Sequence, residues 1–243
     1  MLRIRLAFTF LLFAGACFCT APTMAQDAEY QITFEGRWNP SLPTPGSAHF
    51  TQVIGATHNS STSLFSMGQM ATEGVEDVAE LGVVDTLEDE IGALIGNGSA
   101  DTLILGADTF IDPEETDAFT FFANESHSEV SLLTMIAPSP DWFVGIDSLD
   151  LRDGAGNWRN EIVLDLLSYD AGTEDGDGFS LNNPATNPQE TIQLLDTAEP
   201  GNPLAGAGSI ARVTFTRLNV VPEPGSFAVL FGCMIFTATR RRR

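Results

Sequence analysis

Residues 26–221 contain no cysteine and no lysine, because the three cysteines, Cys17, Cys19 and Cys233, all lie outside this stretch. Without paired cysteines this part of the chain cannot hold a disulfide, so its stability must come from an apolar core or from bound metal. The 11 basic residues of the whole sequence are all arginines, and every acidic residue except Glu223 falls within 26–221. Such an acidic surface repels nucleic acid and anionic membranes, and it attracts divalent cations.

Motifs for nucleophilic or zinc catalysis are also missing. No Gly-x-Ser-x-Gly turn occurs, and the three histidines, His49, His58 and His127, are too scattered for a zinc-binding pair. Acidic residues are so numerous that a carboxylate pair for glycoside hydrolysis gives no distinct signal. The sequence therefore favours a binding protein over a hydrolase.

Both ends of the chain differ from its middle. Residues 1–25 are typical of a signal peptide for removal by signal peptidase, with Arg3 and Arg5 before an apolar run and the small residues Thr23 and Ala25 at the cleavage site. Residues 26–221 have the length of one domain.

Residues 222–243 combine three features in a fixed order. Pro222, Glu223 and Pro224 come first, a short apolar run over 227–239 follows, and Arg240, Arg241, Arg242 and Arg243 end the chain. The apolar run is shorter than the roughly 20 residues of a full membrane span. This arrangement resembles the PEP-CTERM sorting signal of Gram-negative bacteria. The resemblance implies transient anchoring in the inner membrane, processing by an exosortase, and export to the cell surface or extracellular matrix.

Hydrophobic periodicity predicts a mainly β domain with one or two short helices. Alternation indicates strands at 30–34, 102–105, 118–123, 130–137, 148–151, 162–167 and 210–218, with a further edge strand at 190–195. Three/four spacing over 72–95 indicates two amphipathic helices that begin at Thr72 and Thr86 and end at Gly82 and Gly96. Short strands joined by Asp, Gly, Asn and Pro favour an antiparallel sandwich, in which 171–189 is a long loop.

The segment Pro138–Asp147 is the candidate functional stretch, because Asp141 follows two prolines at the predicted apex of a loop and precedes Trp142 and Phe143. Either Asp141 caps the turn, or it is a hard oxygen ligand held by packed rings. Other acids also follow strands. Either they form solvated Asp-Gly turns, or loops at one end of a sandwich bring them together around calcium. These acids are Asp147, Asp153, Asp170, Glu174, Asp175 and Asp177.

Several blocks of the chain resemble the spondin N-terminal domain. They are residues 30–38 (YQITFEGRW), 48–50 (AHF), 54–59 (IGATHN), 127–131 (HSEVS), 138–151 (PSPDWFVGIDSLDL), Trp158, 169–173 (YDAGT) and 210–216 (IARVTFT). The resemblance covers nearly all of 28–218 and implies a C2-like antiparallel β-sandwich with a calcium site at one end. It also implies an extracellular adhesion or matrix protein.

The same resemblance implies that Asp141 and Asp170 are calcium ligands. A third family ligand, a glutamate five residues before the His-Ser-x-Val-Ser block, corresponds here to Phe122, which cannot ligate. Either Asp117 or Glu125 replaces it, or the site lacks this ligand.

We therefore expect a non-catalytic, calcium-binding adhesion module at the cell surface. Its partner is a surface polysaccharide or a protein, and nucleic acid is excluded. A carbohydrate-binding module is the alternative, and a hydrolase is the second alternative.

Overall fold

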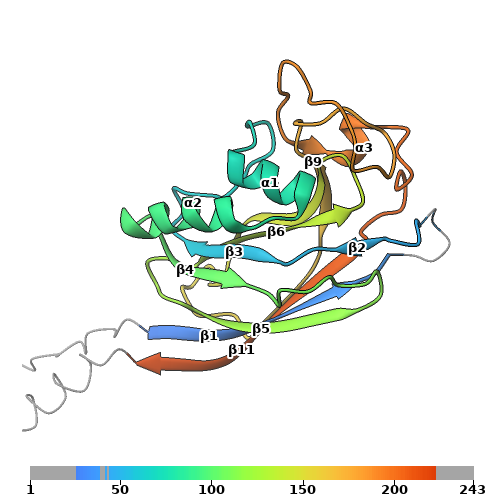
Figure 1. Ribbon diagram of the computed structural model, residues 1–243. Helices are drawn as coiled ribbons and strands as arrows, with labels where there is room; N and C mark the ends of the chain where they lie inside the picture. Colours follow the sequence, from blue (N-terminus) through green and yellow to red (C-terminus); the bar gives the residue numbers. More distant parts are fainter. Residues whose placement is uncertain (1–25, 39–41, 43, 223–243) are drawn as a thin grey trace, which may run out of the picture.

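The computed structural model describes residues 26–38, 42 and 44–222, and it shows two antiparallel β-sheets packed face to face (Figure 1). Helices α1 (Glu73–Leu81) and α2 (Asp85–Gly96) cover the outer face of one sheet and so add a third layer. The predicted antiparallel sandwich with short helices is confirmed.

The first sheet has four strands in the order β5-β1-β11-β8. Its strands are β1 (Gln26–Gly36), β5 (Thr116–Ala123), β8 (Glu161–Asp165) and β11 (Ala211–Pro222). The two long central strands, β1 and β11, pair along their whole length, from Gln26 opposite Pro222 to Gly36 opposite Ala211.

The second sheet has seven strands, with the order β10-β9-β7-β6-β3-β4 and β2 paired to β6. Its strands are β2 (His49–Phe50), β3 (Ile54–His58), β4 (Ala100–Leu105), β6 (Glu129–Ala137), β7 (Trp142–Asp150), β9 (Leu167–Asp170) and β10 (Gln193–Leu194). A short helix, α3 (Leu195–Ala198), follows β10. The central strand β6 is buried on both faces, because the first sheet covers one face and the helices cover the other.

Two apolar cores follow from these layers. The larger core lies between the sheets and contains large rings such as Tyr30, Phe34 and Trp142. The smaller core lies between the second sheet and the helices, where Val75 and Val78 of α1 meet Leu133 and Phe143. Each buried side chain of this size contributes roughly 1.5–3 kcal/mol, which compensates for the absence of disulfides in this part of the chain.

The helix boundaries confirm most of the sequence prediction. The Thr72 side chain accepts a hydrogen bond from the Val75 N–H and caps α1, and Gly82 ends this helix in the left-handed conformation. Helix α2, however, begins at Asp85 without a side-chain cap. The expected start at Thr86 is wrong because the Thr86 hydroxyl donates to the Asp77 carboxylate of α1 instead.

Strand positions differ from the prediction at two places. The strand expected at 148–151 begins at Trp142, so most of the expected loop is the buried first half of β7. The strand expected at 162–167 is divided between β8 and β9, which belong to different sheets. Hydrophobic periodicity misses both boundaries. In β7 the first residues are buried without alternation, and between β8 and β9 the chain passes from one sheet to the other. The predicted edge strand at 190–195 is reduced to the two residues of β10.

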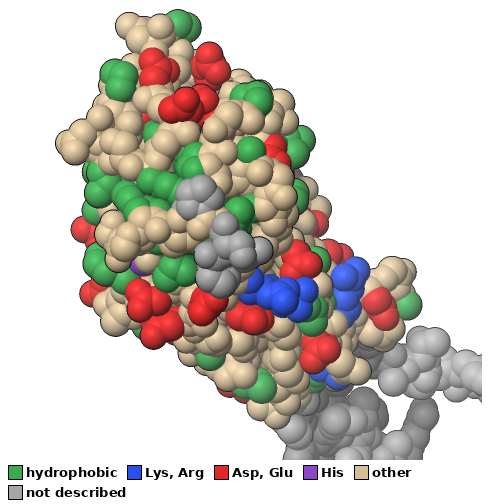
Figure 2. Space-filling view, turned by 90° about the vertical axis from the view of Figure 1, so that its right-hand side faces the viewer, with side chains coloured by type: hydrophobic (Ala, Val, Ile, Leu, Met, Phe, Trp, Pro, Cys, Tyr) green, Lys and Arg blue, Asp and Glu red, His purple; other side chains and the backbone are tan. Residues whose placement is uncertain are grey.

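The predicted signal peptide and the Glu223–Arg243 part of the predicted sorting signal lie outside the described residues. Within 26–38, 42 and 44–222, the helices are too short and too polar to cross a bilayer. Acidic side chains are spread over the face shown in Figure 2, whereas basic side chains gather in one small area. The ion pairs among the described residues join Arg37 and Arg212 to Glu35 and Asp165.

Candidate metal centre

Asp141 lies in the turn between β6 and β7 and is fully buried. The Ser139 hydroxyl fixes this turn by accepting a hydrogen bond from the Trp142 N–H at 3.1 Å. The Trp142 ring is buried in the core between the sheets, and Phe143 on the opposite face of the strand is buried against the helix layer. The aromatic pair thus anchors the chain on both sides of the sheet directly after Asp141.

The two carboxylate oxygens of Asp141 have different surroundings. Oδ2 accepts hydrogen bonds from the Thr173 N–H at 2.7 Å, the Thr173 hydroxyl at 3.2 Å and the Glu174 N–H at 3.2 Å. Oδ1 is buried without a hydrogen-bond partner among the described residues. A buried carboxylate oxygen without a partner is costly, so Oδ1 of Asp141 is open to a further interaction.

Gly172 makes the backbone contacts to Asp141 possible. Its φ of +75° is in the left-handed region, and a Cβ there would come within 2.6 Å of the Glu190 carbonyl oxygen. This conformation turns the chain back after β9, so that the Thr173 and Glu174 N–H groups point to Asp141.

Asp170 brings a second buried carboxylate to the same place. It lies opposite Trp142 in the β7–β9 pair, and the Ala171 N–H donates to the Asp141 carbonyl oxygen at 3.1 Å. Burial and the negative charge of Asp141 raise the pKa of Asp170 to about 7, although a hydrogen bond from the Gly172 N–H opposes this. Burial also raises the pKa of Asp141.

Further acids surround this pair. Burial raises the pKa values of Glu80, Glu174 and Glu199, and the Asp141 charge contributes to each rise. Glu80 reaches the site from α1, where its carboxylate lies close to the Thr173 hydroxyl. Sequence reasoning missed Glu80, yet Glu73, Glu76 and Glu80 follow helical spacing after the predicted helix start at Thr72.

The spondin resemblance extends over the whole domain that carries this site. The sequence profile of the Spondin_N family matches residues 28–206. The chain belongs to the Spondin_N family. That range contains Asp141, Asp170 and Glu80, together with most of both sheets.

Curated relatives of this spondin-type domain come from animals. Human and rat Spondin-2 are each 35% identical over 225 residues, a match that covers 86% of this chain and 66% of the relative. Human Spondin-1 is 32% identical over 218 residues, which covers 81% of this chain and 27% of the relative. The chain thus spans just under two thirds of Spondin-2 and about a quarter of Spondin-1.

The spondin-type fold does not bring the expected third ligands to Asp141. Asp117 lies on β5 in the other sheet, where its Oδ2 accepts a hydrogen bond from the Ala107 N–H at 2.9 Å. Glu125 lies in the turn before β6, about 30 Å from Asp141 by the rise of a nine-residue strand. Phe122 is 50% exposed near the far end of β5.

Several other acids that follow strands also lie apart from Asp141. Asp147 is six residues further along β7, about 20 Å away. Asp153 accepts hydrogen bonds from the N–H groups of Ala155 and Asn157 at 2.9 Å each, which confirms the turn interpretation for this residue. Asp175 accepts from the Thr186 hydroxyl at 2.7 Å. Of the predicted set, Asp141, Asp170 and Glu174 are brought together.

The Asp141 and Asp170 pair fits a hard cation that keeps part of its water shell. Within the described residues, no three His, Cys, Asp or Glu side chains close around one point tightly enough to enclose a metal ion. The free Oδ1 of Asp141 and the buried Asp170 carboxylate nevertheless supply two anionic oxygens. Calcium accepts carboxylate, carbonyl and water oxygens in flexible geometry, so water would fill its remaining positions.

Proposed function

We propose that this chain is a non-catalytic, calcium-binding adhesion module that is exported to the surface or matrix of a Gram-negative bacterium. The observation that carries the calcium part is the unpartnered, fully buried Oδ1 of Asp141 beside the buried Asp170 carboxylate. Two adjacent buried negative charges destabilise each other and the fold, and a divalent cation would relieve this repulsion. Membership of the Spondin_N family supports the extracellular binding role.

The cation would have a structural effect on the surrounding loop. Asp141 is bonded to Thr173 and Glu174 at the start of the long 171–189 segment. Fixing Asp141 and Asp170 would therefore fix the surface that this segment forms with the β6–β7 turn. We propose that this end of the sandwich contacts the polysaccharide or protein partner, and that calcium holds it in its binding conformation.

Thermal unfolding of chelator-treated protein tests the calcium part. A ligand at a hundredfold excess over its dissociation constant stabilises the native state by about 2.7 kcal/mol. For a domain of this size, that corresponds to a rise in melting temperature of about 5–10 °C. We expect this rise with millimolar calcium in the unaltered protein, and its loss in Asp141→Asn and in Asp170→Asn.

Asp153→Asn is the matched control, because Asp153 is a turn-forming aspartate outside the site. It should keep the full response to calcium. A melting temperature that millimolar calcium leaves unchanged in the unaltered protein would overturn the metal proposal. A normal response in Asp141→Asn or Asp170→Asn would overturn the ligand role of that residue.

The location part of the proposal rests on residues 222–243, with Pro222, Glu223 and Pro224 as the recognition motif and Arg240–Arg243 as the cytoplasmic anchor. An exosortase would cleave the chain near this motif after signal peptidase has removed residues 1–25. Deletion of 222–243 should move the protein from the cell surface to the soluble periplasmic or secreted fraction. Identical fractionation of the full and the shortened chains would contradict the sorting role.

A further inference from the structure

A second polar site lies on the helix side of β7, away from Asp141. A concavity of about 480 Å³ opens between the loop that leads into α1 and the second half of β7. Seven serine and threonine side chains line it, together with Gln69 and Met70 and one carboxylate, Asp147. None of its described lining residues is basic. We call it the hydroxyl concavity.

Asp147 organises the hydroxyl groups of this concavity. Its Oδ1 accepts hydrogen bonds from the Ser63 and Ser66 hydroxyls, the latter at 3.2 Å, and the Ser148 hydroxyl lies at 3.5 Å. Several side chains from two separate segments therefore converge on one oxygen. Such convergence fixes the direction of the hydroxyls at the floor of the concavity.

The hydrogen-bond network continues into the core beneath the floor. Ser63 lies 3.4 Å from the buried Ser131 hydroxyl, which lies 2.8 Å from Nε2 of the buried His58. The Nδ1 atom of His58 contacts the Asn59 carbonyl oxygen at 3.0 Å. Buried polar groups are costly unless they are satisfied by such partners, so this network specifies one position for the floor.

The loop that forms the other wall is held at both ends and in its middle. The Asn59 N–H donates to the Ser99 carbonyl at 3.0 Å, and the backbones of Gly68, Gln69 and Ile192 exchange two hydrogen bonds of 2.8 Å. The buried Phe65 ring packs edge-on against Phe143 at a centroid distance of 5.0 Å. The concavity is therefore preformed, which lowers the entropic cost of binding.

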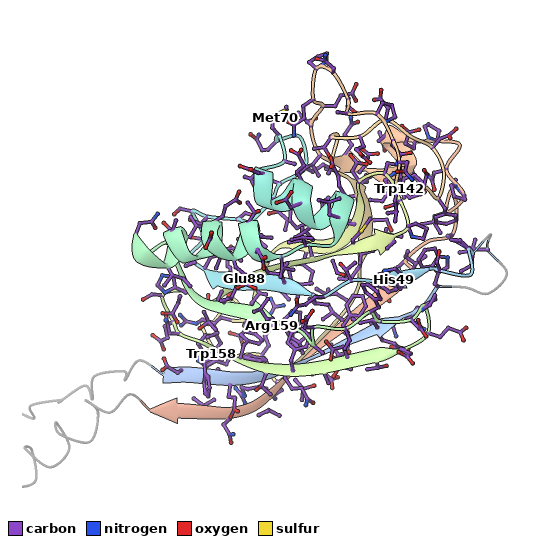
Figure 3. The ribbon with its side chains drawn as sticks, viewed as in Figure 1. His49, Met70, Glu88, Trp142, Trp158 and Arg159 are labelled. Carbon is purple, nitrogen blue, oxygen red and sulfur yellow. The ribbon has the colours of Figure 1, made fainter. Side chains whose placement is uncertain are left out.

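The lining selects the chemistry of the ligand. An anion would be repelled by Asp147, a metal would find a single carboxylate, and an apolar ligand would leave the hydroxyls unpaired. A neutral sugar supplies hydroxyls that donate to the carboxylate and accept from Ser, Thr and Gln side chains. Its C–H face matches Met70, which is 46% exposed on the loop before α1 (Figure 3).

We propose that the hydroxyl concavity binds one or two residues of an uncharged polysaccharide. Its volume lies within the range of about 300–1,000 Å³ that is usual for small-ligand sites. This proposal rests on the extracellular binding role proposed above and goes beyond it, because it assigns a second binding site away from the Asp141 end. The sugar site uses Asp147, Gln69 and Met70, so its occupancy does not require the Asp141 centre.

Affinity electrophoresis of the full chain tests the proposal, with dextran, galactomannan, glucomannan or arabinan cast separately into native gels. We expect at least one of these neutral polysaccharides to retard the protein. Asp147→Asn should weaken that retardation about tenfold, as is typical when a hydrogen bond to a charged group is lost. Met70→Ala should weaken it severalfold, and Ser60→Trp should abolish it by filling the open concavity.

Asp150→Asn is the matched control, because Asp150 lies on the same strand but bonds Ser128 and the Arg152 N–H outside the concavity. It should bind as the unaltered chain does. Ser60 is exposed, so Ser60→Trp tests the site even where Asp147→Asn perturbs folding. The absence of retardation in all four gels, or normal retardation of Ser60→Trp, would overturn the proposal.

Parallel gels with calcium and with chelator separate this proposal from the calcium proposal. Sugar binding that persists in chelator while Asp141→Asn abolishes the thermal response supports two independent sites. If the unaltered chain shows no thermal response to calcium but is still retarded by a polysaccharide, the calcium centre alone is contradicted. If it responds to calcium but is not retarded, the sugar site alone is contradicted.

Discussion

The polar groups at the two ends of β7 are satisfied in opposite ways. At the start of the strand, Asp141 is fully buried and its Oδ1 has no hydrogen-bond partner among the described residues. At the end, the buried Tyr30 hydroxyl donates to the Arg159 carbonyl at 2.7 Å, and Asp153 is saturated by backbone N–H groups in its own turn. The polar groups at the end of β7 find their partners within the chain, whereas the Asp141 carboxylate at its start lacks a positively charged partner among the described residues.

The pKa values record the same contrast. Hydrogen bonds from Asn157 lower the pKa of the exposed Asp153, whereas burial raises the pKa of Asp141. An aspartate that only shapes a turn gains stability from its negative charge. An aspartate whose charge is destabilised by burial is instead a candidate for a functional site.

The largest expected difference between the two ends is in the cost of removing each aspartate. In chelated protein, Asp141→Ala should lower the free energy of unfolding by about 2–3 kcal/mol, because the Thr173 and Glu174 N–H groups lose their acceptor. Asp153→Ala should cost much less, because water can replace its carboxylate. Urea denaturation measures both, and equal costs would contradict the contrast.

Replacement of Asp141 by Asn sharpens this result. The amide oxygen can still accept from Thr173 and Glu174, while the buried negative charge disappears. Without calcium, Asp141→Asn should therefore be at least as stable as the unaltered chain. A loss as large as that of Asp141→Ala would show that the charge itself stabilises the metal-free fold.

Unfolding at alkaline pH tests the end of β7, where the polar groups are paired within the chain. Burial raises the pKa of Tyr30 to about 12 from its ordinary value of 10.0. Between these two values the folded protein keeps the proton and the unfolded chain releases it, so stability should fall by about 3 kcal/mol as the pH rises. Tyr30→Phe should remove most of this pH dependence and cost about 1 kcal/mol at neutral pH. An unaltered alkaline slope in the variant would contradict the assignment.

The smallest expected effect concerns Asp153 in acid. Its pKa in the folded protein is lowered, so its contribution to stability is present above the pKa of the unfolded chain and disappears as the pH falls through the folded value. Asp153→Asn should slightly reduce the loss of stability below pH 4, as followed by circular dichroism. A steeper acid transition in the variant would contradict this sign.

Local sequence features predicted much of this molecule. Alternation found the central strands, Thr72 and Gly82 marked both ends of α1, and the family blocks indicated Asp141 and Asp170. Their proximity depends on long-range pairing, since Asp170 reaches Asp141 only because the chain leaves the first sheet after β8 and β9 pairs with β7. Glu80 was missed for the same reason, because a helix residue becomes part of the site only through packing of α1 on the second sheet.

Other features of the structure could not be predicted from any local pattern in the sequence. Asp147 and Asp153 both follow apolar runs. Asp147 nevertheless faces the serine and threonine hydroxyls of the concavity, whereas Asp153 accepts hydrogen bonds from the backbone of its own turn. The serines at 60–66 resemble an ordinary polar loop until Ser63 and Ser66 meet Asp147 on a strand more than 80 residues later. Side-chain partners at such separations are set by the arrangement of the layers.

The complete pairing of β1 with β11 has a mechanical consequence. Gln26 and Pro222 lie side by side, while Gly36 and Ala211 mark the end near Trp38, Phe179 and Trp142, about 35 Å away. A pull applied at Pro222, against a partner held at the Asp141 end, acts along β11. The hydrogen bonds of β11 to β1 and β8 are perpendicular to that direction, so they bear the load together in shear. This topology resists tension applied along β11.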